Sequence, residues 1–216
     1  MHAWHASRVP RDLNDLPEWE RLLAAERHVG HRRSSEGDHV LADLRGRFDE
    51  VLAALESAAG WQTERVRRPV LILGSMDGIL TGIRQLRRTA PLETEEIDGL
   101  RVPTLSEMAR IKAWLLATRH TVRDYLDTVV LFERLGTAGV EAALRPFDAI
   151  YRQLGGTSPL SEVAERLAAA APSDHAAVDL ATYRGLSAPW NQWEHLVARG
   201  RAWAPLVARV ALEAAP

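Results

Sequence analysis

A single lysine stands in a chain that otherwise relies on arginine for positive charge. Of its 27 lysine and arginine side chains, only Lys112 is a lysine, and the other 26 are arginines. It belongs to the stretch ARIKAWLLATRHTVRDYLD, residues 109–127. Because a lysine ammonium is a compact point charge on a flexible stem, it suits contact with a polyphosphate. Lys112 is therefore the first candidate for a phosphate-binding residue.

Charged residues recur around Lys112 at helical spacing. If residues 109–127 form one helix, the 3.6-residue period brings four of them within roughly 80° of one face. These are Lys112, Arg119, Arg123 and Asp127. Together with Asp124 they make three cations and two carboxylates, a balanced set that could hold an anion. The alternative is a solvated helix face with an ordinary surface pair between Arg123 and Asp127. The apolar residues would then face a core: Ile111, Leu115, Val122 and Tyr125.

A second polar cluster lies in GHRRSSEGDHV, residues 30–40. Glu36 and Asp38 are two positions apart, and in an extended strand this spacing places both carboxylates on one face. Two such carboxylates can share a Mg²⁺ ion, which prefers hard oxygen ligands and leaves positions for substrate phosphates. The alternatives are a polar loop, or a zinc site on His28, His31 and His39 whose spacing matches no standard pattern.

The first half of the chain must position these residues. The segment 39–60 has one apolar helical face, and Gly60 suits a helix end. Asp77–Gly78 lies between the apolar runs 61–74 and 79–86, which is a strong hairpin signal. Asp98–Gly99 repeats it between 92–97 and 100–102. The apolar helical face is formed by Leu44, Phe48, Val51, Leu52 and Leu55.

The second half is predicted to be helical. TLSE, residues 104–107, fits a capping box that opens a helix. Further helical patterns follow at 137–156, 158–172 and in the tail 183–212, and a short helix is expected at 16–28. We predict an α+β fold: a small mixed or antiparallel sheet with flanking helices, followed by an all-α C-terminal half. The expected domains are 1–102 and 103–216.

The composition bounds the function. The chain has 216 residues, 46% of them hydrophobic, and a formal net charge of −2, so a nucleic-acid partner would need a local basic patch. Cysteine is absent, which excludes disulfides and thiolate sites. No signal peptide or membrane-spanning stretch is evident, so a cytoplasmic protein is expected. Alanine- and arginine-rich usage is typical of GC-rich bacterial genomes.

Two further sets of residues are ambiguous from sequence. RVRR at 65–68, Arg84 and the pair at 87–88 could line one sheet face as a patch for an RNA backbone, or form a solvated strand face. Trp190, Trp193 and Trp203 are expected to pack in a helical core, with base stacking as the alternative.

The two charged clusters together resemble the AbiEii-type toxin nucleotidyltransferases of the DNA polymerase β superfamily. GHRRSSEGD, residues 30–38, resembles the family's G-H-R-x-S-x-D-x-D motif, with Glu36 in place of the first aspartate. KAWLLATRHTVRDYLD, residues 112–127, matches its K-x6-R-x3-(K/R)-D-x2-D motif at each spaced position. The segment 21–29, which aligns with the family's Gly-Gly-(Ser/Thr) turn, has no glycine. The chain thus resembles a degenerate or truncated member.

The resemblance implies a function and a set of site residues. The family transfers a nucleoside monophosphate from an NTP to an acceptor such as tRNA, with Mg²⁺, and acts as the toxin beside an antitoxin protein. Glu36 and Asp38 would bind the metal, with Asp38 also in the catalytic set. Lys112, Asp124 and Asp127 would complete that set. The substrate-binding residues would be His31, Arg32, Ser34, Lys112, Arg119 and Arg123. The alternative is an inactive relative that binds a nucleotide or a partner protein.

Overall fold

The fold is α+β, as predicted. The computed structural model describes residues 36–88, 90–97, 100–151 and 158–214. The strands of a four-stranded mixed sheet and of a two-stranded sheet, with one helix among them, precede the other described helices. The backbone divides into two compact units. The first takes in the described residues of 34–91 and 96–100, and the second those of 92–95 and 101–216.

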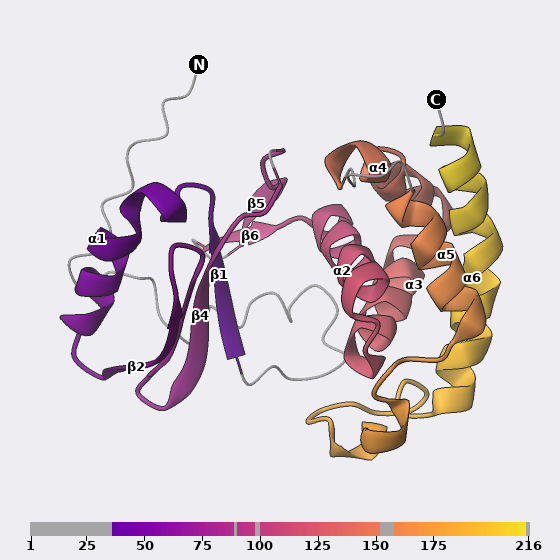
Figure 1. Ribbon diagram of the computed structural model, residues 1–216. Coiled ribbons are helices and arrows are strands. Elements are labelled where there is room, and N and C mark those ends of the chain that lie inside the picture. Colours follow the sequence, from indigo (N-terminus) through magenta and orange to yellow (C-terminus); the bar gives the residue numbers. More distant parts are fainter. Residues whose placement is uncertain (1–35, 89, 98–99, 152–157, 215–216) are drawn as a thin grey trace. The chain divides into compact units, whose positions relative to one another are not determined.

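The first unit is built on the four-stranded sheet, in the order β1-β4-β3-β2 (Figure 1). Its strands are β1 (Glu36–Leu41), β2 (Trp61–Arg67), β3 (Leu71–Met76) and β4 (Ile79–Gln85). β1 runs parallel to β4, whereas β3 is antiparallel to both of its neighbours. The polar loop considered as an alternative for 30–40 does not hold from Glu36 onward, where the chain is a strand. The run 61–74 is two strands rather than one, so that prediction was wrong.

Helix α1 (Leu44–Glu56) covers one face of this sheet (Figure 1). Its apolar face is buried as predicted and packs on Ile72 and Met76 of β3. The helix ends at Ser57 rather than at Gly60. Gly60 instead has a φ of 83° just before β2, and a Cβ there would lie 2.2 Å from an Asp77 carboxylate oxygen. The glycine therefore serves the entry into β2. The five buried α1 residues are Leu44, Phe48, Val51, Leu52 and Leu55.

The hairpin predicted at Asp77–Gly78 is confirmed. Both residues have positive φ, 48° and 82°, which is the geometry of a two-residue turn matched to strand twist. β3 and β4 pair on either side of it, from Met76 opposite Ile79 to Leu71 opposite Arg84. The second hairpin signal also flanks a strand pair, β5 (Thr94–Ile97) and β6 (Leu100–Pro103).

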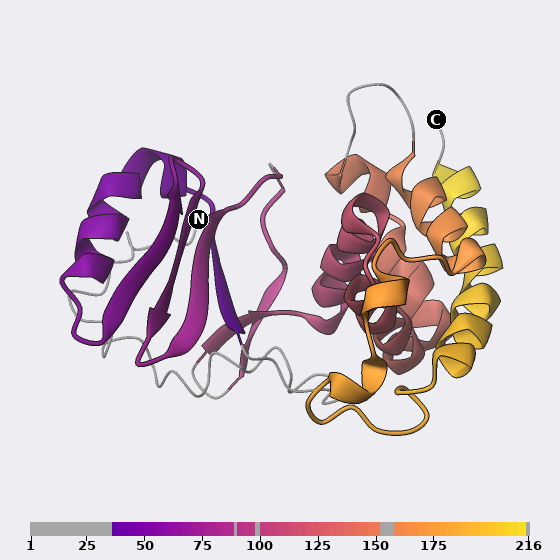
Figure 2. The ribbon, with the colours of Figure 1, turned by 60° about the horizontal axis from the view of Figure 1, so that its bottom comes forward.

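The second unit is a helical bundle. Figures 1 and 2 show α5 and α6 side by side against α2 and α3. The predicted helix 137–156 is instead the end of α3 followed by α4, with 152–157 outside the described residues. The tail becomes a regular α-helix only at Trp193. The bounds are α2 (Leu105–Arg119), α3 (Val122–Leu144), α4 (Phe147–Ile150), α5 (Pro159–Ala169) and α6 (Trp193–Ala214).

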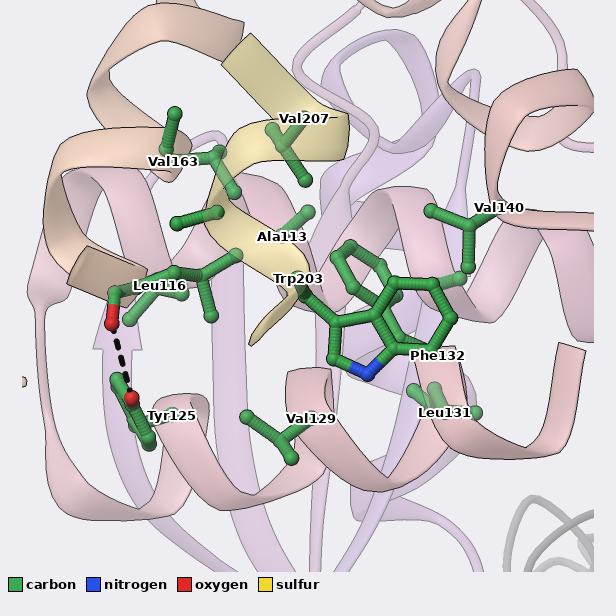
Figure 3. Close-up of a cluster of buried hydrophobic side chains, with 14 of the residues drawn as sticks. Ala113, Leu116, Tyr125, Val129, Leu131, Phe132, Val140, Val163, Trp203 and Val207 are labelled. Carbon is green, nitrogen blue, oxygen red and sulfur yellow. Dashed lines mark hydrogen bonds between the residues drawn. The ribbon is translucent and has the colours of Figure 1, made fainter. Parts of the chain in front are cut away.

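The bundle core draws on all of its long helices (Figure 3). Phe132 and Trp203 meet edge to face with ring centroids 5.8 Å apart, so Trp203 packs in the core as expected. The Tyr125 hydroxyl donates a hydrogen bond to the Leu167 carbonyl at 3.0 Å (Figure 3). Burial raises the pKa of Tyr125 to about 12. A Cβ on Gly200 would lie 1.9 Å from that hydroxyl, so only glycine lets α6 approach there.

Helix length and polarity argue against a transmembrane helix within the described ranges. None of the helices found there combines the length and the apolar character that crossing a membrane requires.

Candidate functional site

The Lys112 motif forms a helical hairpin, and the assumption of one continuous helix over 109–127 was wrong. α2 ends at Arg119 because His120 takes the left-handed conformation, with φ 52° and ψ 48°. Thr121 then opens α3, and its hydroxyl accepts a hydrogen bond from the Asp124 amide at 3.2 Å. The motif therefore places its residues on two packed helices.

Lys112 on α2 meets Asp127 on α3. The ammonium nitrogen lies 2.8 Å from a carboxylate oxygen of Asp127. The carboxylate is almost fully buried, with 2% of its side chain exposed, whereas 18% of the lysine side chain reaches solvent. Because an ammonium has three N–H donors, Lys112 keeps donors beyond the one that points to Asp127. The pair thus neutralises a buried acid and leaves a cation near the surface.

Asp124 is held by its own set of donors. Arg119 approaches it with two nitrogens, at 3.1 Å and 2.6 Å, and the Thr121 hydroxyl donates to it at 2.7 Å. The carboxylate side chain is fully buried, while 53% of the Arg119 side chain is exposed. These bonds fix the turn between the two helices. Asp124 is therefore a positioning residue in this geometry.

Arg123 completes the predicted cluster and differs from its neighbours. It is partly buried on the first turn of α3. Within the described ranges its guanidinium has neither an ion pair nor a hydrogen bond. A guanidinium carries five N–H donors in a planar fork that matches phosphate oxygens. Arg123 is thus the cation of the hairpin best placed to accept an anionic ligand without first losing a protein partner.

The apolar residues of the motif divide into two sets. Val122 and Tyr125 are fully buried in the core, as predicted. Ile111 and Leu115 are only partly buried and lie outside the core cluster, so their assignment to a core was wrong. The reason is that α2 presents other residues to the bundle: Ala109, Ala113 and Leu116. The surface beside Lys112 is therefore partly apolar.

The predicted metal ligands lie in the first unit. Glu36 and Asp38 both belong to β1, which confirms the extended backbone expected for them. In the parallel pair with β4, Glu36 lies opposite Leu80 and Asp38 opposite Gly82. His31, Arg32 and Ser34 lie outside the described residues. Among the side chains that are described, no three of the types His, Asp and Glu gather as a metal site.

A second buried ionic group, here named the Arg110 cluster, was missed from sequence. It consists of Arg110, Glu107 and Glu93, with Arg110 nitrogen to carboxylate distances of 2.9 Å to Glu107 and 2.5 Å to Glu93. Arg110 also donates to the Ala143 carbonyl at 3.2 Å. Burial lowers the pKa of Arg110, but the hydrogen bonds with both carboxylates outweigh it and raise the pKa overall. The i,i+3 spacing of Glu107 and Arg110 was the available signal.

His120 lies at the turn of the hairpin. Its backbone carbonyl accepts hydrogen bonds from the amide and hydroxyl of Ser173, which ties the turn to the segment after α5. Its Nε2 is buried and has no hydrogen-bond partner in the described part of the chain. Burial, together with the nearby Arg166 cation, lowers the pKa of His120. The imidazole is therefore held in its neutral form.

Comparisons with known proteins assign the chain to no family. No protein-family model, no curated protein and no solved structure matches the chain. The resemblance to the AbiEii-type nucleotidyltransferases, which rests on residues 30–38 and 112–127, therefore stays a prediction.

Proposed function

We propose that the protein is a Mg²⁺-dependent nucleotidyltransferase-like protein that transfers a nucleoside monophosphate from an NTP to an acceptor such as tRNA. We further propose that it acts as the toxin of a toxin–antitoxin system. The observation that carries the proposal is the helical hairpin with Lys112, Arg119 and Arg123. It presents three cations, of which Arg123 has no protein partner in the described ranges and Lys112 keeps spare donors.

The chemistry assigned to these residues is electrostatic. In the proposed transfer the acceptor hydroxyl attacks the α-phosphorus, the bond between the α- and β-phosphates breaks and pyrophosphate leaves. Fixed cations stabilise the charge that develops on the phosphate oxygens. Lys112 and Arg123 would bind the phosphates, and Asp127 would hold the lysine in place. Glu36 and Asp38, two positions apart on β1, are the proposed Mg²⁺ ligands. Bound there, the ion would supply positive charge for the phosphate oxygens and for the acceptor hydroxyl.

A second candidate is a relative that binds a nucleotide or a partner protein without turnover. Two observations favour it. The buried carboxylate of Asp124 already accepts three hydrogen bonds from Arg119 and Thr121, an arrangement that suits a structural role better than that of a base. The segment 21–29 also lacks the glycines with which a turn can approach a nucleotide phosphate.

Labelled nucleotides distinguish the two candidates. The purified chain is incubated with Mg²⁺, total tRNA and each NTP labelled at the α-phosphate, and calorimetry measures Mg²⁺–NTP binding in parallel. Labelled RNA supports the enzyme, and binding without transfer supports the module. Absence of both contradicts the enzyme and the nucleotide-binding module, and leaves only the binding of a partner protein. In a bacterial host, expression of the active enzyme should slow growth.

Variants of the lone lysine test the site itself. Lys112→Ala should abolish detectable Mg²⁺–NTP binding, and Lys112→Arg should restore it only in part because the guanidinium is larger and planar. Arg145→Gln is the matched control, since Arg145 is an exposed arginine at the other end of α3. Equal affinity in all of these proteins would return Lys112 to the status of a surface residue. Circular dichroism verifies that each variant is folded.

A further inference from the structure

The strand register sorts the arginines of the first unit onto two faces of the sheet. Ile72 and Met76 of β3 face α1, so the alternate residues Leu71 and Leu73 belong to the opposite face. Arg67 pairs with Leu71, and Arg65 pairs with Leu73. Because directly paired residues share a face, both arginines project away from α1. Both are exposed.

The same row continues across the sheet. Leu71 pairs on its other side with Arg84, and Arg84 pairs with Val40 on the edge strand β1. Leu80, two residues before Gly82 on β4, belongs to the same face. Val40 and Leu80 have 43% and 41% of their surface exposed, which is unusual for large apolar side chains in this chain. We name this surface the arginine face: Arg65, Arg67, Arg84, Val40 and Leu80.

Arg68 shows what an arginine of this region does on the opposite face. It forms an ion pair with Asp49 of α1, and its guanidinium lies 5.2 Å from the ring centroid of Phe48. In contrast, Arg65 and Arg67 have neither an ion pair nor a hydrogen bond in the part of the chain that the structure describes. Two exposed cations two residues apart on one strand, without partners among the described residues, are available to an external anion.

We propose that the arginine face binds the phosphate backbone of a single-stranded RNA. Arg65 and Arg67 lie about 7 Å apart along β2 by strand geometry, so they can contact neighbouring phosphates of one strand. The exposed Val40 and Leu80 add apolar surface, which unstacked bases of a single strand can cover and the enclosed bases of a duplex cannot. The choice of RNA rests on the proposed function, whereas binding of a single-stranded polyanion does not.

The register also connects this face to the proposed metal ligands. The row that begins at Arg65 passes through Leu73 and Gly82 to Asp38 on β1. The neighbouring row runs from Arg67 through Leu71 and Arg84 to Val40. A strand of RNA held along these rows would lead from β2 toward the edge where the metal is proposed. The arginine face is thus the acceptor-binding surface of the proposed reaction.

Fluorescence anisotropy of a labelled single-stranded RNA of mixed sequence tests the proposal. The full chain and its variants are titrated over a range of potassium chloride concentrations. The double variant Arg65→Gln/Arg67→Gln should bind at least about tenfold more weakly at low salt. The slope of log affinity against log salt should fall by about 1.4, since each lost contact to a single strand contributes about 0.7. Arg68→Gln, on the α1 face, should change neither quantity.

Each other outcome overturns the proposal. The proposal is wrong if the wild-type chain does not bind the RNA, or if the double variant binds the RNA normally. It is also wrong if Arg68→Gln weakens RNA binding as much as the double variant does. A double variant that loses binding to anionic lipid vesicles while its RNA binding is unchanged would overturn the proposal as well. Mg²⁺–NTP binding, measured on the same proteins, should be unaffected by the double variant. Loss of RNA binding in the double variant without any nucleotide transfer by the wild type would refute the proposed function alone.

Discussion

Helix α2 contributes residues to two ionic clusters. Both pair basic side chains with carboxylates, but their cations differ in the number of partners that they have within the protein. In the Arg110 cluster, a guanidinium with 3% of its side chain exposed bonds to Glu93, Glu107 and the Ala143 carbonyl. In the hairpin cluster, which begins at Lys112 two residues further along α2, Lys112 has a single described partner and Arg123 has none. A buried cation that bonds to several protein acceptors stabilises the fold, whereas a cation with spare donors near solvent can bind a ligand. Net charge alone would not distinguish them.

The largest expected effect belongs to the Arg110 cluster. Arg110→Ala leaves the fully buried Glu107 without its cation, and removing one partner of a buried pair costs about 3–5 kcal/mol. Urea denaturation should show this loss in the free energy of unfolding. Arg209→Ala is the control, because that arginine pairs with Glu141 at the surface and its loss should leave the unfolding midpoint unchanged. A destabilisation below about 1 kcal/mol would remove the distinction between the clusters.

The Lys112 pair should be less important for stability than the Arg110 cluster. Lys112→Ala removes the cation of the almost fully buried Asp127, but water can enter where the lysine reached solvent, so we expect a loss of about 1–2 kcal/mol. Chemical denaturation measured beside Arg110→Ala gives the comparison directly. If Lys112→Ala were as destabilising as Arg110→Ala, the lysine would be a structural residue. Loss of NTP binding in Lys112→Ala would then not show that Lys112 contacts the NTP.

Arg123 offers the sharpest separation of binding from folding. Because it has no partner in the described ranges, Arg123→Gln should leave the free energy of unfolding unchanged. The same substitution should weaken Mg²⁺–NTP binding about fivefold, or about 1 kcal/mol, through loss of one partly solvated charged contact. Calorimetry and denaturation on one preparation measure both. Unchanged affinity would exclude Arg123 from the proposed site.

The smallest effect concerns the turn that joins α2 to α3. Because the pKa of His120 is lowered in the folded state, the unfolded chain binds the proton more readily. The stability contribution is therefore fully present above the ordinary pKa of about 6.5 and is lost as pH falls through the lowered value. His120→Asn keeps a residue that tolerates positive φ. Its unfolding free energy should fall less than that of the wild type as the pH drops from 7 to 5. Parallel pH curves would contradict this.

Much of the local structure was predictable because short-range chemistry fixes it. The apolar period of 39–60 identified the five buried residues of α1, and Asp77–Gly78 identified the β3–β4 hairpin, since few residue pairs accept two positive φ angles. TLSE located the start of α2 through the Thr104 cap. The strand at Glu36 was harder, because its polar sequence lacks apolar alternation and only pairing with β4 shows it.

The charged cluster was predicted in its members but not in its geometry. The spacing of Lys112, Arg119 and Arg123 suggested one stripe, yet His120 ends the helix and puts Arg123 on another. Histidine gives no strong signal for a left-handed cap, so a periodic pattern was extended across the turn. The partners of Asp124 and Asp127 then depended on how two helices pack, which spacing along one helix does not describe.

The sequence by itself determined that Lys112 is the lone lysine, that charged residues gather around it, and that strands precede helices. These follow from residue types and from periods of two and 3.6, which act over neighbouring positions. Only the tertiary structure decided that Arg110 bonds to two carboxylates and a carbonyl while Arg123 has no described partner, and that Arg67 and Arg68 take opposite faces of one sheet. Partners distant in sequence make those differences, and burial and strand register select them.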